Sequence, residues 1–369
     1  MDYRDMKLKI DNKGTNSDEN IIIELKKSNR PILIYGNANH AELVWEYLKS
    51  HEIVIEAFIV DCQYFNKNQY IKSVPVKNIE DYMPEIEKYN IVIGFCNVDR
   101  SKCLLNNMEL LRTRFYLLWE PYVAYEWNRE YIEENYDALE SVYESLSDVH
   151  SKKIFNELIN AKLNKSGRKM LELADGKQYF NELTFCVNSK EEVFVDCGAF
   201  DGDTVKQYAS FTGGVYKKIF AFEPNLDNVA KLEENVKHLP NVKIVNKGTW
   251  KEKGELEFEE KGSASQIIKK GKVKIPVTTI DEVVGEEKVT FIKMDVEGSE
   301  LESLEGAKMT IQKNMPKLAI CCYHKKNDII NLYRFIKRFD SSDLKYQLYL
   351  RHHSNSAYET VLYAIPVKV

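Results

Sequence analysis

The chain has 369 residues, of which 44% are hydrophobic, and a formal net charge of −5. This length suggests two or three domains at roughly 150 residues each, and acidic and basic residues are interspersed, without the basic excess of a dedicated nucleic-acid-binding protein. The seven cysteines include no CxxC pair, which indicates reduced thiols and gives no zinc-ligand spacing. The N-terminal residues are polar, and no apolar run approaches the ~18 residues of a membrane span. We therefore expect a cytoplasmic protein without a bound metal, a membrane span or a nucleic-acid partner.

Residues 1–120 are predicted to form a Rossmann-like α/β domain. Strand-like apolar runs alternate there with amphipathic helical patterns, as in a parallel sheet. One glycine, Gly36, follows the first strand, where a dinucleotide-binding loop has three, and Asp61 ends the next strand, about where a ribose-binding acid would lie. A scaffold, a dimer interface that gives a homo-oligomer, or an acceptor-docking module is therefore favoured over a nucleotide site.

Residues 121–173 have helical periodicity and are predicted to form a helical connector, followed by a second α/β domain at 174–369. Helices are expected to begin at "TIDE" (279–282) and "SELE" (299–302), which have capping-box spacing. "HHSNSA" separates the last two strands, which should form an antiparallel hairpin. The strands expected in this domain are 192–197, 218–223, 242–247, 272–278, 289–295, 317–323, 345–351 and 358–365.

The segment "VFVDCGAFDGDT" (193–204) predicts a strand, a glycine turn and the start of a helix. It lacks the G-x-G-x-x-G spacing of a dinucleotide loop. Gly198 would let the backbone approach a ligand, and Gly202 would permit the tight turn. An acidic turn would repel a pyrophosphate, but it suits S-adenosylmethionine, whose ammonium could face Asp196 and whose carboxylate could face the helix N-terminus. The alternative is a structural turn whose aspartates cap the helix.

Glu223 ends the following strand, "KIFAFE". A carboxylate there can accept hydrogen bonds from both ribose hydroxyls, as in dinucleotide-binding folds. Together with the glycine turn, this acid predicts a site for S-adenosylmethionine at the ends of two neighbouring strands.

These motifs, followed in order by "IPVTTIDEV", "FIKMDVEGSELESLEGA" and "ETVLYAIP", resemble the FkbM-type family of S-adenosylmethionine-dependent O-methyltransferases over about residues 175–369. The resemblance implies a class I methyltransferase fold, in which a seven-stranded, mostly parallel sheet has an antiparallel last strand. It also implies that the glycine turn lines the methionine end of the cofactor and that Glu223 binds its ribose. The predicted cofactor-binding residues are Asp196, Gly198, Ala199, Phe200, Asp201, Gly202, Thr204, Glu223, Pro224, Asn225, Gly248, Thr249, Trp250 and Asp295.

In this family the segment "NKGTW" (246–250) would flank the adenine, and its Thr249 and Trp250 depart from the residues usual there. Trp250 would either stack on the adenine or fill the core.

Two acids and a histidine follow strands at the carboxyl edge of the predicted sheet, where open α/β proteins bind ligands. Two close acids raise the pKa of at least one of them, and the ordinary pKa of histidine suits a general base. We therefore predict that Asp295, Glu297 and His324 are catalytic. The alternatives are that Glu297 caps the next helix, that Asp295 fixes the turn and that His324 is a loop histidine. Lys293 could neutralise the two acids.

Further candidates for the acceptor site are Tyr179, Ser265, His352 and His353. The alternatives are that the two histidines are ordinary loop residues and that Ser265 belongs to a flexible surface loop. The predicted function is methyl transfer from S-adenosylmethionine to a hydroxyl of a sugar or glycan, which could be nucleotide-linked, in surface polysaccharide biosynthesis. The alternatives are an NAD(P)-dependent sugar-modifying oxidoreductase or epimerase that uses the first domain, and a non-catalytic cofactor-binding module. A nucleic-acid methyltransferase is disfavoured because the sequence shows neither an N/D-P-P-Y/F motif nor a basic face.

Overall fold

The computed structural model describes the chain except for residues 1–7, 11–16, 109–111, 120, 122–126, 186–188, 260–265 and 268–272. The chain divides into two compact units. Unit 1 comprises Met1–Tyr136, Lys152–Gly176 and His352–Glu359, and unit 2 comprises Asp137–Ser151, Lys177–Arg351 and Thr360–Val369. Each unit is therefore assembled from several separate stretches of the chain. The expected domain boundaries at residues 120 and 173 stay a prediction.

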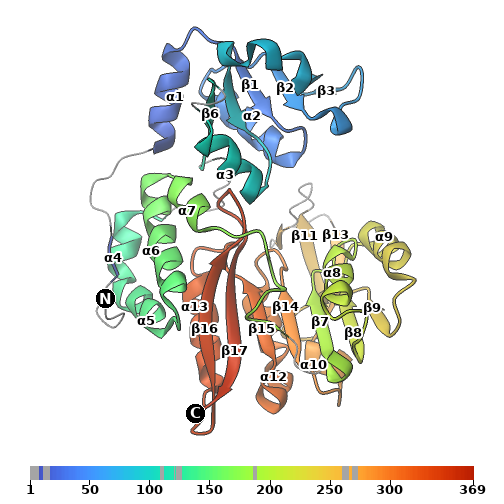
Figure 1. Ribbon diagram of the computed structural model, residues 1–369. Coiled ribbons are helices and arrows are strands. Elements are labelled where there is room, and N and C mark those ends of the chain that lie inside the picture. Colours follow the sequence, from blue (N-terminus) through green and yellow to red (C-terminus); the bar gives the residue numbers. More distant parts are fainter. Residues whose placement is uncertain are drawn as a thin grey trace. The chain divides into compact units, whose positions relative to one another are not determined.

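Unit 1 contains a six-stranded sheet in the order β3-β4-β2-β1-β5-β6 (Figure 1). All its pairs are parallel except that between β3 and β4. The central strands are buried along their whole length, as expected for parallel strands covered on both faces. The strands are β1 (Ile32–Tyr35), β2 (Ala57–Val60), β3 (Tyr70–Ile71), β4 (Val74–Asn78), β5 (Asn90–Ile93) and β6 (Arg114–Tyr116).

The helices of the N-terminal half are α1 (Ser17–Lys27), α2 (Asn39–Ser50), α3 (Val98–Asn106), α4 (Arg129–Glu134), α5 (Tyr136–Ser145), α6 (Val149–Asn164) and α7 (Arg168–Leu173). The described residues between 121 and 173 are therefore mainly helical, as their periodicity predicts. Among all described residues, no helix has the length and apolar composition needed to cross a membrane.

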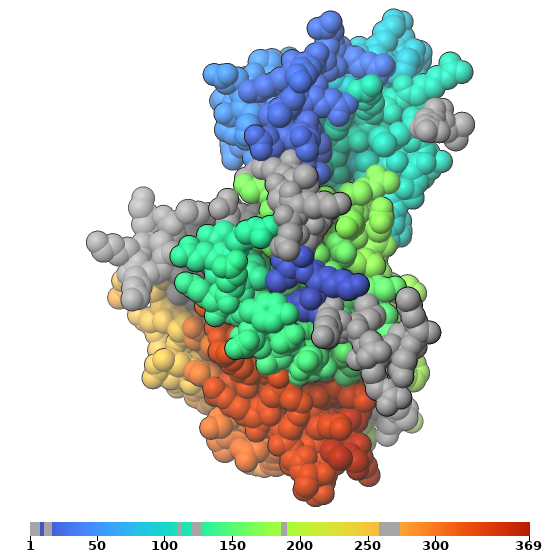
Figure 2. Space-filling view, turned by 90° about the vertical axis from the view of Figure 1, so that its left-hand side faces the viewer, coloured from blue at the N-terminus to red at the C-terminus, as the bar shows by residue number. Residues whose placement is uncertain are grey.

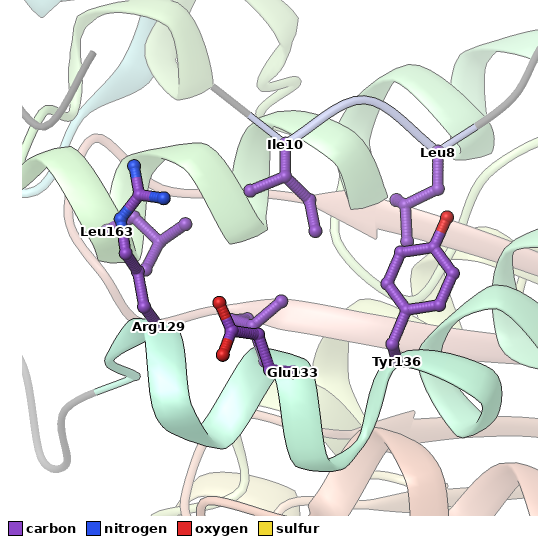
Figure 3. A pocket seen from close by; sticks show the side chains of 7 residues that line it. Leu8, Ile10, Arg129, Glu133, Tyr136 and Leu163 are labelled. Atoms are coloured by element: carbon purple, nitrogen blue, oxygen red, sulfur yellow. The ribbon is translucent and has the colours of Figure 1, made fainter. Parts of the chain in front are cut away.

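A short N-terminal stretch covers α6. The backbone N–H of Lys9 donates to the Asn156 side chain at 2.7 Å, and the Asn160 amide donates to the Lys9 carbonyl at 3.1 Å (dark blue on green in Figure 2). A pocket of about 300 Å³ lies beside this stretch (Figure 3), and none of the predicted site residues lines it. Its walls are Leu8, Ile10, Arg129, Ile132, Glu133, Tyr136 and Leu163.

The strand order of unit 1 reverses between β1 and β5, the position at which doubly wound sheets bind ligands. Residues 352–359 lie against the loop that follows β5. The Asn355 amide donates to the Phe95 carbonyl and to the Ser101 hydroxyl, both at 2.8 Å, and the Cys96 thiol contacts the Ser354 hydroxyl at 3.5 Å. The chain's own polar segment 352–359 thus bonds the loop after β5 at this position.

Unit 2 is built on a seven-stranded sheet in the order β16-β17-β15-β14-β7-β8-β9, drawn from yellow-green to red in Figure 1. Five neighbouring strands pair in parallel, and β17 is antiparallel to β15. The expected mostly parallel sheet with an antiparallel last strand is confirmed. The strands are β7 (Val193–Cys197), β8 (Lys218–Phe222), β9 (Val242–Val245), β14 (Phe291–Met294), β15 (Lys317–Cys321), β16 (Leu344–His352) and β17 (Thr360–Lys368).

The strand expected at 272–278 belongs to a second, four-stranded sheet with the order β10-β13-β11-β12. Its members are β10 (Gly248–Thr249), β11 (Gly254–Glu259), β12 (Gln266–Ile267) and β13 (Val273–Thr278). The helices of unit 2 beyond residue 200 are α8 (Asp203–Phe211), α9 (Leu226–Val236), α10 (Ile280–Val284), α11 (Glu300–Glu305), α12 (Lys308–Asn314) and α13 (Asp328–Ile336).

Aromatic side chains form the core between the large sheet and α8. The rings of Phe194 and Tyr208 stack at 4.2 Å, and Phe291 lies 5.2 Å from Phe194. Each fully buried aromatic ring contributes roughly 1.5–3 kcal/mol by leaving water. This core supports β7 and β14 directly beneath the loops that carry the predicted site.

Candidate active site

Four strands of the large sheet bring the predicted site residues to one edge. β15, β14, β7 and β8 are neighbours in this order, and parallel strands end at the same edge. Asp196 lies within β7, whereas Glu223, Asp295 and His324 lie just beyond β8, β14 and β15. The chain reaches this edge from four separate parts of the sequence.

The glycine turn after β7 requires both of its glycines. Gly198 has φ +80°, and a Cβ built on it would lie 2.0 Å from the carbonyl oxygen of Asp295. The close approach predicted at Gly198 is therefore an approach to the backbone beyond β14. Gly202 has φ +87° and forms the N-cap position of α8, in agreement with the predicted tight turn. Ala199 is fully buried in the core.

The aspartates of the turn bond their own helix. The Asp201 carboxylate accepts the backbone N–H of Asp203 at 3.1 Å, and the Asp203 carboxylate accepts the N–H of Thr204 at 2.7 Å. Two of the first amides of α8, which were expected to meet a ligand carboxylate, already have partners. The geometry favours the capping role for these two aspartates.

Asp196 has a lysine as its partner. Lys293 Nζ lies 3.0 Å from Asp196 Oδ1 and donates to the Gly198 carbonyl at 2.9 Å. The strand register explains this pair, because Lys293 on β14 stands opposite Asp196 on β7. The contact of Asp196 with a ligand ammonium stays a prediction. The charge of Lys293 also acts on Asp295, as expected, because it is the main charge that lowers the pKa of that carboxyl. Burial raises the pKa of Asp196 to about 6, although the Lys293 charge opposes this rise.

Glu223 joins the glycine turn to the start of α9. Its Oε2 accepts the N–H of Phe200 at 3.0 Å, and its Oε1 accepts the N–H of Asn225 at 3.0 Å and the Asn228 amide at 3.3 Å. Burial raises the pKa of Glu223. A carboxylate has about four acceptor positions, so these three donors leave room for a ligand hydroxyl. Pro224 contributes its carbonyl, which accepts the Asn246 amide at 3.1 Å.

The segment expected beside the adenine forms β10. Thr249 is buried, and its hydroxyl lies 2.7 Å from the Ser303 hydroxyl on α11. Its side chain therefore packs inside the protein. Trp250 is half-buried, and its backbone N–H donates to Thr278. Contact of Gly248 and Trp250 with an adenine stays a prediction.

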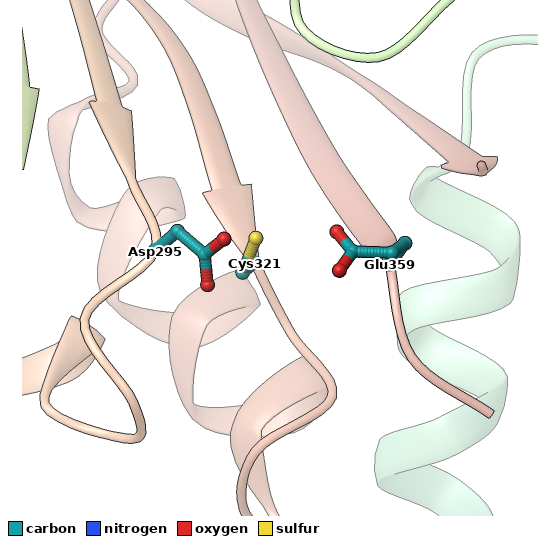
Figure 4. Close-up of side chains that lie close together, drawn as sticks. All are labelled: Asp295, Cys321 and Glu359. Carbon is teal, nitrogen blue, oxygen red and sulfur yellow. The ribbon is translucent and has the colours of Figure 1, made fainter. Parts of the chain in front are cut away.

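Asp295 lies beside the end of β15 (Figure 4). Its carboxylate accepts the hydroxyl of Tyr179 at 3.1 Å and that of Tyr323 at 3.2 Å, and the Tyr179 hydroxyl lies 3.3 Å from the Cys321 thiol. Burial opposes ionisation, but Lys293 and then the neighbouring histidine outweigh it, so the pKa of Asp295 is lowered. The expectation that two close acids would raise this pKa does not apply to Asp295.

His324 is 8% exposed and surrounded by acids. Its Nε2 lies 3.5 Å from both Asp295 Oδ1 and Glu297 Oε2, and its Nδ1 lies 2.9 Å from Glu300 Oε1. Burial alone would lower the pKa of His324, but Glu300, Asp295 and Glu297 raise it to about 10. The histidine is thus an imidazolium at neutral pH in the ligand-free protein.

Sequence reasoning missed Glu300. The "SELE" pattern was expected to cap its helix through Ser299, but Ser299 makes no side-chain cap and its hydroxyl instead donates to the Val296 carbonyl. Glu300 bonds the turn in its place, and it is fully buried. The useful signal was a glutamate at the first position of a helix that follows an acidic turn.

Asp295, Glu300 and His324 place one ligand atom each within 4.8 Å of one another, which is a grouping that could hold a metal ion. His324 Nδ1 and Glu300 Oε1 themselves lie 2.9 Å apart and form an ion pair. We therefore regard Glu300 as the partner of the imidazole.

Three predicted site residues adopt left-handed backbone conformations. Tyr179, Phe200 and Glu297 have φ values of +61°, +48° and +53°, which costs on the order of 1–3 kcal/mol for each residue that is not glycine. They lie on three different loops of unit 2, all next to the carboxyl edge. Strained backbone of this kind is common where loops present side chains to a ligand.

The remaining acceptor-site candidates have different outcomes. Tyr179 joins the Asp295 cluster. His352 and His353 are buried in unit 1, where His353 Nδ1 lies 2.9 Å from the Asp175 carbonyl and burial lowers the pKa of His352 to about 3. Ser265 lies outside the described residues. A role for any of them toward an acceptor stays a prediction.

Comparisons with known proteins find similarity to methyltransferases. Residues 196–353 match the family model described as Methyltransferase FkbM domain. Over 102 residues, the chain is 35% identical to the hexuronic acid methyltransferase AglP of Haloferax volcanii; this alignment covers 26% of the chain and 43%, less than half, of that relative.

The crystal structure of the methyltransferase FkbM from Methylobacillus flagellatus KT matches with a TM-score of 0.64 at 19% identity, over 95% of this chain and 94% of that one. This likeness shows a shared fold. An rRNA methylase from Streptococcus thermophilus matches with a TM-score of 0.33 at 17% identity, over 50% of this chain and 90% of that one.

Proposed function

Because residues 196–353 match the family model of the FkbM methyltransferase domain, we propose that the chain transfers a methyl group from S-adenosylmethionine to a hydroxyl group of a sugar or glycan. The observation that carries the proposal is the placement of Glu223. Its carboxylate is tied to the glycine turn through the Phe200 N–H at 3.0 Å and keeps one acceptor position for a ribose hydroxyl. An acid fixed in this way at the end of the second strand supports binding of a nucleoside.

The other acids at the carboxyl edge of the large sheet suit a positively charged nucleoside. S-adenosylmethionine supplies an activated methyl group on a positively charged sulfur. The carboxylates of Asp295 and Glu297 are 25% and 35% exposed, so both can be reached from solvent. The pKa of Asp295 is lowered, so this residue offers a negative charge at neutral pH. Asp295 and the loop bearing Phe200 would therefore hold the charged methionine end of S-adenosylmethionine, and Glu223 would hold its ribose.

The chain must also remove the proton of the acceptor hydroxyl. His324 Nε2 and the carboxylates of Asp295 and Glu297 converge at 3.5 Å, so each is within reach of the same small volume. His324 is protonated in the ligand-free protein, but a cation bound beside it lowers its pKa, because like charges disfavour the protonated form. We assign proton removal to the neutral His324, with Asp295 orienting the hydroxyl. A general base contributes roughly 10²–10⁴-fold to such a reaction.

The sugar class of the acceptor is supported by a relative. The archaeal protein that is 35% identical over 102 residues is named for methylation of hexuronic acid. We therefore expect a uronic acid or a related sugar, which could be nucleotide-linked and would belong to surface polysaccharide biosynthesis. A screen should begin with free, nucleotide-linked and glycan-bound hexuronic acids.

The rival function, a nicotinamide-dependent oxidoreductase, would need the ligand crevice of unit 1. Asp61, expected about where a ribose-binding acid lies, accepts the Tyr35 hydroxyl at 2.8 Å and pairs with Arg100 at 2.5 Å. The loop after β5 is bonded by Asn355. Both observations count against a dinucleotide there.

Isothermal titration calorimetry tests the proposal. The protein should bind S-adenosylmethionine and S-adenosylhomocysteine, but neither NAD nor NADP. Glu223→Ala should weaken the first two by about 1.5–3 kcal/mol, or roughly 10- to 150-fold, because hydrogen bonds to a charged group are lost. Glu233→Ala, at an exposed acid of α9, is the matched control. Binding of NAD alone would contradict the proposal.

A further inference from the structure

Glu300 is a buried acid that bonds the imidazole of His324. It is the first residue of α11 and is fully excluded from solvent. Its Oε1 lies 2.9 Å from His324 Nδ1, which is a normal length for a hydrogen bond between charged groups. Since a carboxylate only accepts, Nδ1 carries the proton of this bond.

The same carboxylate oxygen fixes the turn before α11. It accepts the backbone N–H of Val296 at 3.0 Å and that of Gly298 at 3.3 Å. Between them lies Glu297, with φ +53°, and Gly298 itself has φ +92°. One buried oxygen thus holds both the imidazole and the left-handed turn that presents Glu297.

The hydrogen bond at Nδ1 sets the direction of the other ring nitrogen. Nε2 faces Asp295 Oδ1 and Glu297 Oε2, each at 3.5 Å. These carboxylates are partly exposed, whereas Glu300 is buried, so Nε2 is on the side of the ring that an acceptor can reach. A ring rotated by half a turn about its Cβ–Cγ bond would place Cδ2, a carbon, at Glu300 and lose this arrangement.

We propose that Glu300 is a positioning residue, which holds the Nδ1–H of His324, aims Nε2 at the acceptor hydroxyl and stabilises the imidazolium formed when the proton is taken. In this step the hydroxyl O–H bond breaks and an Nε2–H bond forms. The electron pair left on the hydroxyl oxygen makes the new bond to the methyl carbon, and the sulfur keeps the pair of the bond that breaks. The same division of roles between an acid and a histidine operates in hydrolytic triads. The catalytic part of this inference rests on the proposed function.

Several charged groups other than Glu300 act on the imidazole of His324. A change in the protonation of His324 with pH can therefore be attributed to Glu300 only by comparison with a Glu300 variant. Asp328, at the start of α13, has a pKa raised to about 7, first by burial and then by Glu300. The Tyr323 ring lies 4.1 Å from the imidazole. The charged or titratable groups around His324 are Asp295, Glu297, Glu300, Tyr323, Lys325 and Asp328.

The first test needs no acceptor. Nitrogen-15 NMR of the full chain with labelled histidines, of which there are seven, can follow the protonation of His324 with pH, and the signal is assigned by its loss in His324→Asn. In the wild-type protein the transition should lie well above pH 8, and Nδ1 should keep its proton through it. In Glu300→Gln the midpoint should fall by at least one pH unit. A wild-type midpoint near 6.5, or an unchanged midpoint in the variant, would overturn the inference.

The second test measures turnover at saturating cofactor. Glu300→Gln should lower the high-pH plateau of kcat by roughly tenfold or more, move the alkaline rise of kcat to lower pH, and leave the Kd for S-adenosylhomocysteine within about twofold. Glu300→Asp, which keeps the charge, should restore the position of the rise in part. Glu305→Gln, at an exposed acid of the same helix, should match the wild-type protein. A pH profile of Glu300→Gln that superimposes on that of the wild type would exclude the positioning role.

The two tests separate this inference from the proposed function. If the wild-type protein methylates no sugar but His324 behaves in the NMR titration as described, the function fails and the hydrogen-bonded pair stands. If methyl transfer is found and Glu300→Gln keeps the wild-type pH profile, the function stands and the role of Glu300 is refuted.

Discussion

Lys293 Nζ and Asp196 Oδ1 form an ion pair at 3.0 Å, and the two side chains are 3% and 0% exposed. The pair joins β14 to β7 at the centre of the large sheet. Because Lys293 also donates to the Gly198 carbonyl, the same ammonium fixes the strand and the glycine turn. A charge required inside the fold therefore supports the loop predicted to hold the cofactor.

Lys293→Met should lower the free energy of unfolding by about 3–5 kcal/mol, because it leaves a buried carboxylate without its counter-ion. Urea unfolding at pH 7.5 measures this. The double variant Lys293→Met with Asp196→Asn should recover most of the loss, since neither side chain of the pair is then charged. If Lys293→Met lowers the free energy of unfolding by less than about 1 kcal/mol, the ion pair is not formed in solution.

Gly198→Ala should be far more damaging than Gly214→Ala. The two glycines have φ +80° and +76°, so the backbone strain of the substitution is similar, but only at Gly198 would the new Cβ strike a carbonyl, at 2.0 Å. We expect Gly214→Ala to cost about 1 kcal/mol or somewhat more and Gly198→Ala to cost several times as much and to abolish cofactor binding. Thermal unfolding and calorimetry would show this, and equal losses in the two variants would contradict the close approach.

His324 should make folding stability depend on alkaline pH. Its folded pKa of about 10 lies above the ordinary value, which is near 6.5 in an unfolded chain. The stabilisation is complete below that lower value and is lost as the pH rises through about 10. Urea unfolding from pH 8 to 10.5, above the range in which Asp328 titrates, should show the wild-type advantage over His324→Gln shrinking by at least about 1.4 kcal/mol, the equivalent of one pKa unit. His238→Gln, at an exposed histidine, should run parallel to the wild type.

Asn355→Ala should destabilise unit 1. The buried amide donates to Phe95 and Ser101 at 2.8 Å, and its removal leaves acceptors without a donor, at a cost of about 1–3 kcal/mol. Hydrogen exchange should show faster opening of the loop after β5. Asn66→Ala, at an exposed asparagine of the same unit, should have little effect, and identical exchange in the two variants would show that the segment 352–359 is not held there.

The fold could be predicted because it follows from local patterns. Continuous apolar runs such as "VFVDC" and "FIKM" mark strands buried on both faces, and the alternation with helices fixes a parallel sheet. The position of the site could be predicted for the same reason. Glu223, Asp295 and His324 each follow a strand, and parallel strands end at one edge.

The partners of these residues could not be predicted, because they depend on register and burial. Lys293 meets Asp196 only through the pairing of β14 with β7. Glu300 lies between the two ends of the capping-box pattern, Ser299 and Glu302, and only its complete burial beside His324 shows its role. The run "HHSNSA" is polar enough for a solvated turn, yet residues 352–357 are buried, and His353 and Asn355 bond backbone carbonyls of unit 1.

The path of the chain has a consequence for protein engineering. Because unit 1 takes Lys152–Gly176 and His352–Glu359 as well as the N-terminal part, the polypeptide passes from one unit to the other after residues 136, 151, 176, 351 and 359. A chimera in which all residues before a single crossover point come from another protein would separate residues that belong to the same unit. Recombination with a homologue would preserve both units only if the short insertion at 352–359 travelled together with the N-terminal segment whose loop it bonds.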